Sequence, residues 1–261
     1  MNKSPLVLKM GGRLLEDMQA LDALLQVVKG LAAEYPLVLV HGGGAQVDSW
    51  LATFGFTTEK IDGQRVSPAE QMPVIAGALA GAVIGLMVAR AQVAGLNAVG
   101  LTLAAGHSLK FDINHKLGAV GIASANDGSL VNSLLEKGFV PVFSSIGQSS
   151  DGQLLNVNAD IAAAAICQLV QGTLVLLTDV PGILDGDGKL IKTLNREQAQ
   201  QLVDSGVIKG GMKVKLDAAL ETAAVFRTGN SGSIYFVVDG RAYGPVAPGA
   251  NVAKDIPLAP E

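Results

Sequence analysis

Charged residues are scarce in this chain, and none of them form a basic run. Charged side chains make up 16% of the 261 residues, and 19 basic against 23 acidic residues leave a net charge of −4. An average soluble domain carries about 25% charged residues. Because no lysine- or arginine-rich stretch is present, the sequence offers no patch that binds nucleic acid or an anionic membrane surface. We therefore expect neither as a partner.

Cysteine is almost absent. The one cysteine, Cys167, lies in the apolar stretch AAAAICQLV. A single thiol excludes a disulfide framework and a thiolate zinc cluster, and it is typical of a reducing compartment. At the N-terminus, only four apolar residues separate Ser4 from Lys9, which is too few for a signal-peptide core. We expect a buried thiol and a cytoplasmic protein.

The longest apolar stretch, Pro73–Ala89, carries glycine at every fourth position from Gly77 to Gly85 and is flanked by Glu70 and Arg90. It is shorter than the ~20 apolar residues that a membrane span needs. Small residues at this spacing allow another backbone to approach closely. We expect a buried helix in the interface of a homodimer.

Short apolar runs, glycine turns and helical patterns alternate along the chain, which predicts an α/β protein: a three-layer sandwich with an open, mainly parallel sheet and helices on both faces. The expected strands are Pro5–Met10, Leu37–Val40, Asn97–Leu101, Phe139–Ser144, Thr173–Thr178 and Ser233–Val238. The expected helices are Leu15–Ala33, Ala45–Phe54, Ser67–Val93, Gly128–Lys137, Asn158–Val170, Asn195–Ser205 and Gly211–Phe226. Residues 56–66 and 109–122 are expected to form hairpins. We expect one domain over 1–261, with an N-terminal lobe of about 1–171 and a C-terminal lobe of about 172–261.

Several nucleotide-binding and hydrolytic motifs are absent. The sequence has no GxxxxGK[ST] loop, no GxSxG elbow and no calcium loop, and Gly42–Gly44 does not continue as GxGxxG. His41, His107 and His115 have no metal-ligand spacing. We therefore predict no metal site and no tightly bound cofactor.

Two glycine turns remain, Lys9–Gly12 and His41–Gly44, each between an expected strand and an expected helix. In a parallel sheet both turns lie at the carboxyl edge, where open α/β sheets bind ligands. Backbone N–H groups at such turns and at helix N-termini bind anions. The pattern predicts a phosphate site beside Lys9.

Six segments resemble the amino-acid kinase family in order and spacing: KMGGRLL, VHGGGAQVD, GQRVSPAEQM, LLNVNADIAAAA, LLTDVPGILDGDG and GGMKVKLDAAL. The resemblance covers residues 5 to about 225 and is strongest to the branch that phosphorylates N-acetyl-L-glutamate in arginine biosynthesis. It implies transfer of the γ-phosphoryl of ATP, as its Mg²⁺ complex, to a side-chain carboxylate. A carboxylate is already ionised at neutral pH and needs no general base, so positive charge and positioning supply the catalysis.

The resemblance also implies roles for three charged residues. Lys9 and Lys215 contact the transferring phosphoryl from the acceptor side and the nucleotide side, and Asp160 orients both lysines. Lys213 is an alternative to Lys215, because residues two apart cannot share a helix face. Asp160 has an alternative reading as a helix-cap or first-turn carboxylate at a helix N-terminus.

The remaining implied site residues bind the substrates. Arg65 takes the α-carboxylate of the acceptor, since a guanidinium matches a carboxylate in bidentate fashion; a solvated arginine on a hairpin is the alternative. The other acceptor-binding residues are Asn156, Gly43 and Gly44, and the phosphate-binding residues are Gly11 and Gly12. The nucleotide-binding residues are Asp179, Val180, Pro181, Gly182, Ile183, Leu184, Val207, Ile208 and Lys209.

Two departures from the family pattern keep other functions open. Ile84 stands where close relatives carry asparagine, and the last ~35 residues do not resemble the family's C-terminal strand. The alternatives are a sibling kinase acting on another small carboxylate or on carbamate, and a non-catalytic sensor of an amino acid or nucleotide on the same fold.

Overall fold

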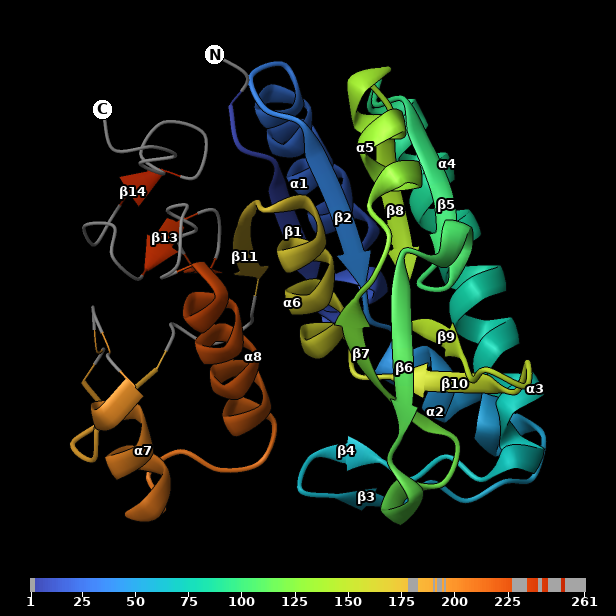
Figure 1. Ribbon diagram of the computed structural model, residues 1–261, viewed down its shortest axis with the longest axis vertical. Helices are drawn as coiled ribbons and strands as arrows, with labels where there is room; N and C mark the ends of the chain where they lie inside the picture. The colour runs from blue at the N-terminus through green and yellow to red at the C-terminus, as the bar shows by residue number, and fades with distance from the viewer. Residues whose placement is uncertain are drawn as a thin grey trace.

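A twisted sheet runs through the molecule (Figure 1). The computed structural model describes residues 3–177, 183–189, 191, 194, 196–226, 234–238, 241–243 and 250–251. Within this part of the chain the sheet has eight strands in the order β14-β13-β12-β11-β1-β2-β8-β5. Their bounds are β1 Leu6–Met10, β2 Leu37–His41, β5 Ala98–Thr102, β8 Val140–Ser144, β11 Thr173–Leu177, β12 Ile234–Val238, β13 Arg241–Tyr243 and β14 Ala250–Asn251.

The strands from β5 to β12 pair in parallel, and β13 and β14 add antiparallel pairs at one edge. Lys9 near the end of β1 stands opposite Val40 on β2 and Leu176 on β11. The carboxyl ends of the central parallel strands therefore meet at one edge, as the sequence predicted.

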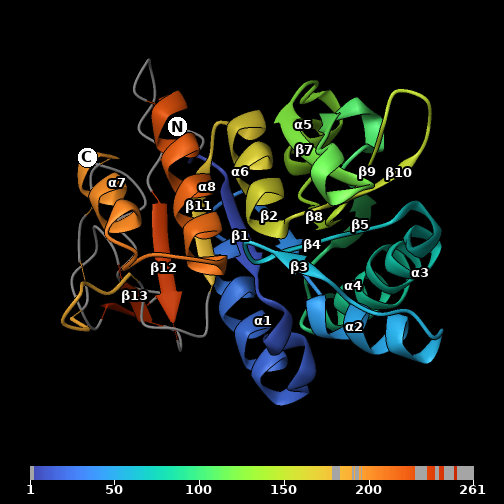
Figure 2. The ribbon, with the colours of Figure 1, turned by 90° about the horizontal axis from the view of Figure 1, so that it is seen from below.

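Helices cover both faces of this sheet, which confirms the three-layer α/β architecture (Figure 2). One face carries α1 (Met18–Ala32), α2 (Gly44–Thr53) and the helical segments between residues 69 and 93. The other carries α5 (Ser129–Glu136), α6 (Ala159–Val170) and α8 (Gly211–Phe226), with α7 (Arg196–Asp204) beside α8.

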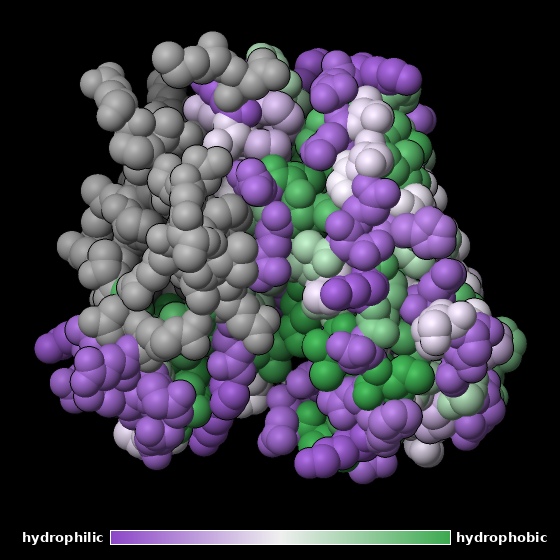
Figure 3. Space-filling model, in the orientation of Figure 1, coloured by the Kyte–Doolittle hydropathy of each residue, from purple (hydrophilic) through white to green (hydrophobic). Residues whose placement is uncertain are grey.

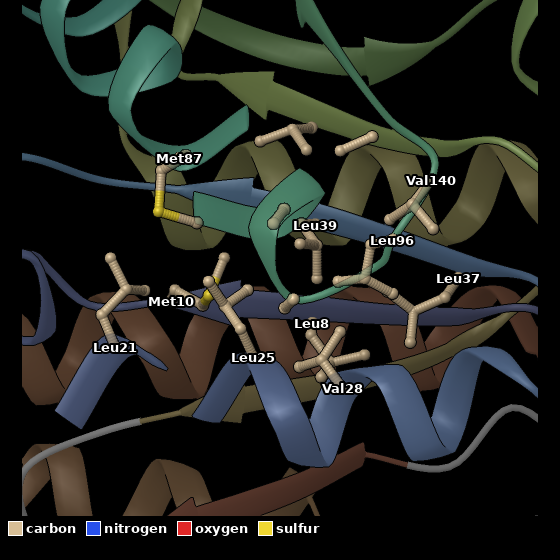
Figure 4. Packing of buried hydrophobic residues seen from close by; sticks show 14 of the residues in the cluster. Leu8, Met10, Leu21, Leu25, Val28, Leu37, Leu39, Met87, Leu96 and Val140 are labelled. Atoms are coloured by element: carbon tan, nitrogen blue, oxygen red, sulfur yellow. The ribbon is translucent and has the colours of Figure 1, made fainter. Parts of the chain in front are cut away.

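Successive side chains of the central strands point to opposite faces of the main sheet, and a hydrophobic core forms on each face. Leu8 and Met10 of β1 pack in the cluster that includes Leu21 and Leu25 of α1 (Figure 4). Val7 points the other way, into the cluster with the alanine-rich helix α6. Burying each leucine contributes about 1.5–3 kcal/mol, so the two cores hold the ends of β1 and β2 in place under the site.

A second, four-stranded sheet lies beside the first, in the order β6-β7-β10-β9. Its strands are β6 (Leu109–Ile113), β7 (Val120–Ala125), β9 (Ile146–Gln148) and β10 (Leu154–Val157). The sequence predicted the β6–β7 hairpin and the small hairpin of β3 (Lys60–Ile61) and β4 (Gln64–Arg65), but not β9 and β10. On the surface drawn in Figure 3, apolar side chains show between polar ones over the centre of the molecule.

The expected helix over 67–93 is interrupted. It consists of η2 (Ala69–Gln71), α3 (Met72–Gly77), a π-helical turn η3 (Ala78–Val83) and α4 (Ile84–Val93).

The most apolar 18-residue window of this helical segment has a mean hydropathy of 2.2 and is 33% buried, so by length and composition alone it could cross a membrane. Its inner side, however, packs against α2, β10, β5 and β8, as a core helix of a folded domain does. The remaining short helices are η1 (Gly12–Glu16), η4 (Ala105–His107) and η5 (His115–Leu117).

Candidate active site

A cleft of about 250 Å³ opens at the carboxyl edge of β1 and β2. Sequence-predicted residues from distant segments line it together: Lys9, Gly43, Gly44, Arg65, Asn156 and Asp160. The second sheet forms one wall through β10, and the β3–β4 hairpin forms another.

Three charged residues form the centre of the site. Lys9 Nζ lies 2.9 Å from Asp160 Oδ1, and Lys215 Nζ lies 2.8 Å from Asp160 Oδ2. The side chains are 7% exposed at Lys9 and Asp160 and 18% at Lys215. They come from β1, the start of α6 and the first turns of α8, so Asp160 links three segments that are far apart in the sequence.

The backbone at the start of α6 fixes Asp160. Asn158 is the N-cap residue, and its Oδ1 accepts hydrogen bonds from the backbone N–H groups of Asp160, at 2.8 Å, and of Ile161. Asn158 thus fills the capping role that asparagine favours. Asp160 is therefore not the cap but the first-turn carboxylate of α6, and its side chain contacts the two lysines.

The charges at this centre do not cancel. Burial lowers the pKa of Lys9, although the charge of Asp160 opposes this effect, and the nearby Lys215 lowers it further. Burial alone would raise the pKa of Asp160, but the charges of Lys9 and Lys215 hold it below its usual value. Two ammonium groups on one carboxylate, at a helix N-terminus, leave a positive site that attracts a multiply charged anion.

The two lysines of α8 pair with different carboxylates. Lys213 Nζ pairs with Asp217 at 2.6 Å on the outer surface, where both side chains are nearly half exposed. Lys215 instead contacts Asp160, which lines the cleft.

Arg65 is not a solvated arginine. Its side chain is 8% exposed, and Nη1 contacts Asp48 Oδ1 at 2.5 Å and Thr58 Oγ1 at 3.2 Å. Nη2 donates to the carbonyl oxygen of Gly44 at 3.1 Å. These contacts hold the guanidinium at the cleft, where it can meet a carboxylate.

Asp48 and Lys60 were not predicted from the sequence. Lys60 Nζ lies 3.2 Å from Asp48 Oδ2 and also lines the cleft. Partial burial alone would raise the pKa of Asp48, but Arg65 and then Lys60 hold it below its usual value. Asp48 follows the HGGG turn by four residues on α2, and only the fold brings it to the hairpin.

The two glycine turns play different structural parts. Gly43 precedes α2 and leaves no room for a side chain, because a Cβ there would lie 2.7 Å from Leu79 Cδ2. Gly44 lies beside Arg65 in the cleft. Gly11 instead faces β11, with its Cβ position 3.7 Å from the carbonyl oxygen of Leu177, and Gly12 begins η1. Neither Gly11 nor Gly12 is among the described residues that line the cleft.

Comparison with known proteins assigns the family. A sequence model of the amino acid kinase family matches residues 4–227. This chain belongs to the amino acid kinase family. Over 224 residues it is 50% identical to an acetylglutamate kinase of Colwellia psychrerythraea, and the match covers 85% of this chain and 86% of the relative. An acetylglutamate kinase of a Shewanella species is 49% identical over the same shares of both chains.

Solved structures agree with this family. The crystal structure of smu.665 from Streptococcus mutans UA159 has a TM-score of 0.79 and 27% sequence identity, and the match covers 90% of this chain and 94% of that one.

The described residues that the sequence predicts to bind the nucleotide separate into two groups. Ile183 and Ile208 are buried in a small hydrophobic cluster with Leu216, so their side chains are not exposed to a ligand. Leu184, Val207 and Lys209 have exposed side chains. The predicted Asp179, Val180, Pro181 and Gly182 lie outside the described residues.

His41 and Cys167 are both fully buried in the core and lie outside the cleft lining. His41 Nδ1 donates to the carbonyl oxygen of Gly42 at 2.8 Å, and burial lowers the pKa of its imidazole to about 4. Burial also raises the pKa of the Cys167 thiol, which contacts the carbonyl oxygen of Gly172. Within the described residues, no group of three or more histidine, cysteine or acidic side chains could hold a metal ion.

Proposed function

We propose that this chain transfers the γ-phosphoryl group of MgATP to the side-chain carboxylate of N-acetyl-L-glutamate, which gives N-acetyl-L-glutamyl 5-phosphate and ADP in arginine biosynthesis. The observation that carries the proposal is the cleft that Lys9, Asp160 and Arg65 line together, with Lys215 paired to Asp160. The curated relatives named acetylglutamate kinase supply the acceptor.

In this mechanism the acceptor carboxylate is the nucleophile. One of its oxygens forms a bond to the γ-phosphorus while the bond from that phosphorus to the β–γ bridging oxygen breaks, and ADP keeps the electron pair. No proton moves, because the carboxylate is ionised at neutral pH. The barrier lies in bringing two anions together, so positioned positive charge lowers it.

The two lysines share this work. Lys9, at the end of β1 in the acceptor cleft, faces the acceptor side, and Lys215 on α8 faces the nucleotide side. Asp160 contacts both ammonium groups and keeps each in place without neutralising the pair. A positioned counter-ion of this kind reduces the reorganisation needed during transfer.

The acceptor is held at its other end. Arg65 binds the α-carboxylate, and Asn156 and the backbone of Gly43 and Gly44 complete the acceptor site. The nucleotide contacts the C-terminal lobe near Val207 and Lys209. Because Asp160, the one carboxylate among the described lining residues, is committed to two lysines, Mg²⁺ arrives with ATP as part of the substrate.

Trapping of the acyl phosphate with hydroxylamine tests the proposal. The protein, MgATP and hydroxylamine are incubated with N-acetyl-L-glutamate, L-glutamate, L-aspartate, or bicarbonate plus ammonia. Hydroxamate with N-acetyl-L-glutamate alone is the expected result. Hydroxamate with a different acid assigns a sibling kinase, and ATP binding with no product from any acceptor favours a sensor.

We propose further that the chain forms a homodimer through a groove between α4 and the edge strand β5. The groove is lined by Ile84, Gly85 and Val88 of α4 and by Gly100 of β5, among others. Ile84, the departure from the family pattern, lies here and outside the cleft. A second copy suits this groove because β5 has a free edge in the described sheet and Val93 of α4 is 81% exposed.

A variant at Gly85 tests the dimer. A Cβ at Gly85 meets nothing within 4 Å in one chain, so Gly85→Arg fits the monomer and blocks only a partner. Sedimentation velocity should show a dimer for the unaltered chain and a monomer for the variant. A monomer for the unaltered chain would refute this interface.

We also propose one domain with two lobes and a cytoplasmic location. The continuous sheet, which runs from β5 through β1 to β12, supports the single domain. The lone, buried thiol of Cys167 supports a reducing compartment.

A further inference from the structure

Ser67 is buried directly behind the acceptor cleft and held rigidly by its backbone. It is 0% exposed and follows β4 by two residues. Its N–H donates to the carbonyl oxygen of Leu117 at 2.8 Å, and its carbonyl oxygen accepts from the N–H of Ala119 at 2.7 Å. Gly118, between them, has φ of +82°, and a Cβ there would lie 2.7 Å from the Ser67 carbonyl oxygen. These bonds fix the backbone that carries the Ser67 hydroxyl group.

Asn156 lies on the other side of the same segment. Its N–H donates to the carbonyl oxygen of Ala119 at 2.9 Å, so Ala119 is bonded to Ser67 on one side and to Asn156 on the other. Across Ala119, Asn156 Nδ2 donates to Ser67 Oγ at 3.0 Å. Asn156 lines the cleft, and Ser67 does not.

The hydroxyl determines which end of the Asn156 amide faces the cleft. Ser67 Oγ also lies 3.5 Å from the carbonyl oxygen of Arg65, a group that can only accept a hydrogen bond. The hydroxyl proton is directed there, which leaves a lone pair of Oγ for Asn156. The amide nitrogen then points to Ser67, and Oδ1, which has no hydrogen bond to another described residue, is available to the cleft.

We infer that Ser67 is a positioning residue that presents Asn156 Oδ1 to the acceptor as a hydrogen-bond acceptor for its acetamido N–H. The inference rests on the proposed function. It gives the cleft two complementary groups for the α-carbon of the substrate: Arg65 donates to the carboxylate, and Asn156 accepts from the nitrogen. Without Ser67, the amide could rotate and offer either end.

A substrate analogue can measure this choice. In 2-acetoxyglutarate an ester oxygen replaces the N–H of N-acetyl-L-glutamate, while the side-chain carboxylate is retained. An acceptor oxygen on Asn156 rejects the ester oxygen, whereas a freely rotating amide can turn Nδ2 towards it. The ratio of kcat/KM for the two acids therefore reports the orientation of the Asn156 amide.

Ser67→Thr and Ser67→Val form the matched pair, because their side chains have nearly the same volume and only threonine keeps the hydroxyl. We expect Ser67→Val to lower the amide-to-ester preference about tenfold, mainly through KM for N-acetyl-L-glutamate, and to leave KM for ATP within about twofold. Ser67→Thr should keep the preference of the unaltered chain. Ser108→Val is the control, since Ser108 is also 0% exposed but donates to Ala105 away from the cleft.

The outcomes separate this inference from the proposed function. A Ser67→Val variant that turns over both acids with an unchanged preference refutes the role of Ser67, as does an equal loss for both acids. If Ser67→Val does not fold, Ser67→Ala takes its place. If the unaltered chain gives no product, the proposed function fails and the same preference is measured as binding by calorimetry; a chain that binds neither acid refutes both ideas.

Discussion

The tip of the β3–β4 hairpin touches the start of α8, and this contact predicts a strict requirement for glycine at position 63. Gly63 has φ of +80°, and a Cβ there would lie 2.8 Å from the backbone nitrogen of Gly211 and 3.0 Å from the carbonyl carbon of Gly210. The hairpin carries Arg65 and α8 carries Lys215. The contact therefore sets the distance between the acceptor site and the phosphoryl site.

Gly63→Ala should disturb that distance. Ordinary Cβ contacts begin at about 3.4 Å, so the hairpin and α8 must separate by roughly half an ångström. Misplacement by about 1 Å can cost on the order of 100-fold in rate, so we expect kcat/KM to fall about tenfold. The left-handed backbone adds about 1–2 kcal/mol of strain for any side chain.

Gly55→Ala is the control for that strain. Gly55 has φ of +79°, and a Cβ there meets nothing within 4 Å. Urea unfolding should show the loss from strain in both variants and a further loss for Gly63→Ala from its contact with α8, whereas the hydroxamate assay should show a loss of kcat/KM only for Gly63→Ala. Equal kcat/KM in the two variants would refute the view that this contact sets the geometry of the site.

Three further variants test the site. Lys215→Met should lower kcat at least about 100-fold because it removes charge from the phosphoryl site, while Lys213→Met on the same helix should stay within about twofold; a similar loss in both would contradict the assignment. Arg65→Lys should raise KM for N-acetyl-L-glutamate about tenfold and leave KM for ATP unchanged, and an unchanged KM for the acid would remove Arg65 from the acceptor site. The pKa of His41 is about 4 in the folded chain, below its unfolded value, so the unfolded state binds the proton more tightly and stability falls by about 2 kcal/mol between pH 7 and pH 4.5. His41→Gln should remove that part of the loss in urea unfolding, and an unchanged pH slope would contradict the neutral, buried imidazole.

The sequence predicts the main sheet well because its strands are continuous apolar runs followed by glycine turns. Leu37–His41 and Thr173–Leu177 are buried along their whole length. Short apolar runs without alternation are typical of parallel strands that are covered on both faces. The expected ends are mostly within one or two residues of those observed.

The strands β9 and β10 were missed for a physical reason. Ile146–Gln148 and Leu154–Val157 have three and four residues, too few for a visible alternation. They form because β7 offers a partner for β10, and that pairing depends on tertiary structure. The π-helical turn at Ala78–Val83 was missed likewise, since small residues fit several helical geometries.

The site was predicted only where a motif marked it. Lys9 and Asp160 stand in recognisable segments, and family register selected Lys215 over Lys213. Asp48 and Ser67 stand in those segments too, but their partners lie on other elements, and spacing alone does not show which side chains meet. Burial, which separates Ile208 from Val207 on the nucleotide side, also becomes visible only in the fold.

Phosphorus-31 NMR can show whether the Lys9–Asp160–Lys215 site makes an acyl phosphate from MgATP and N-acetyl-L-glutamate, because the acyl phosphate, ADP and inorganic phosphate give separate resonances. We expect an acyl-phosphate resonance that grows with ADP and disappears on addition of hydroxylamine. A protein that binds ATP and N-acetyl-L-glutamate but gives no such resonance would contradict it.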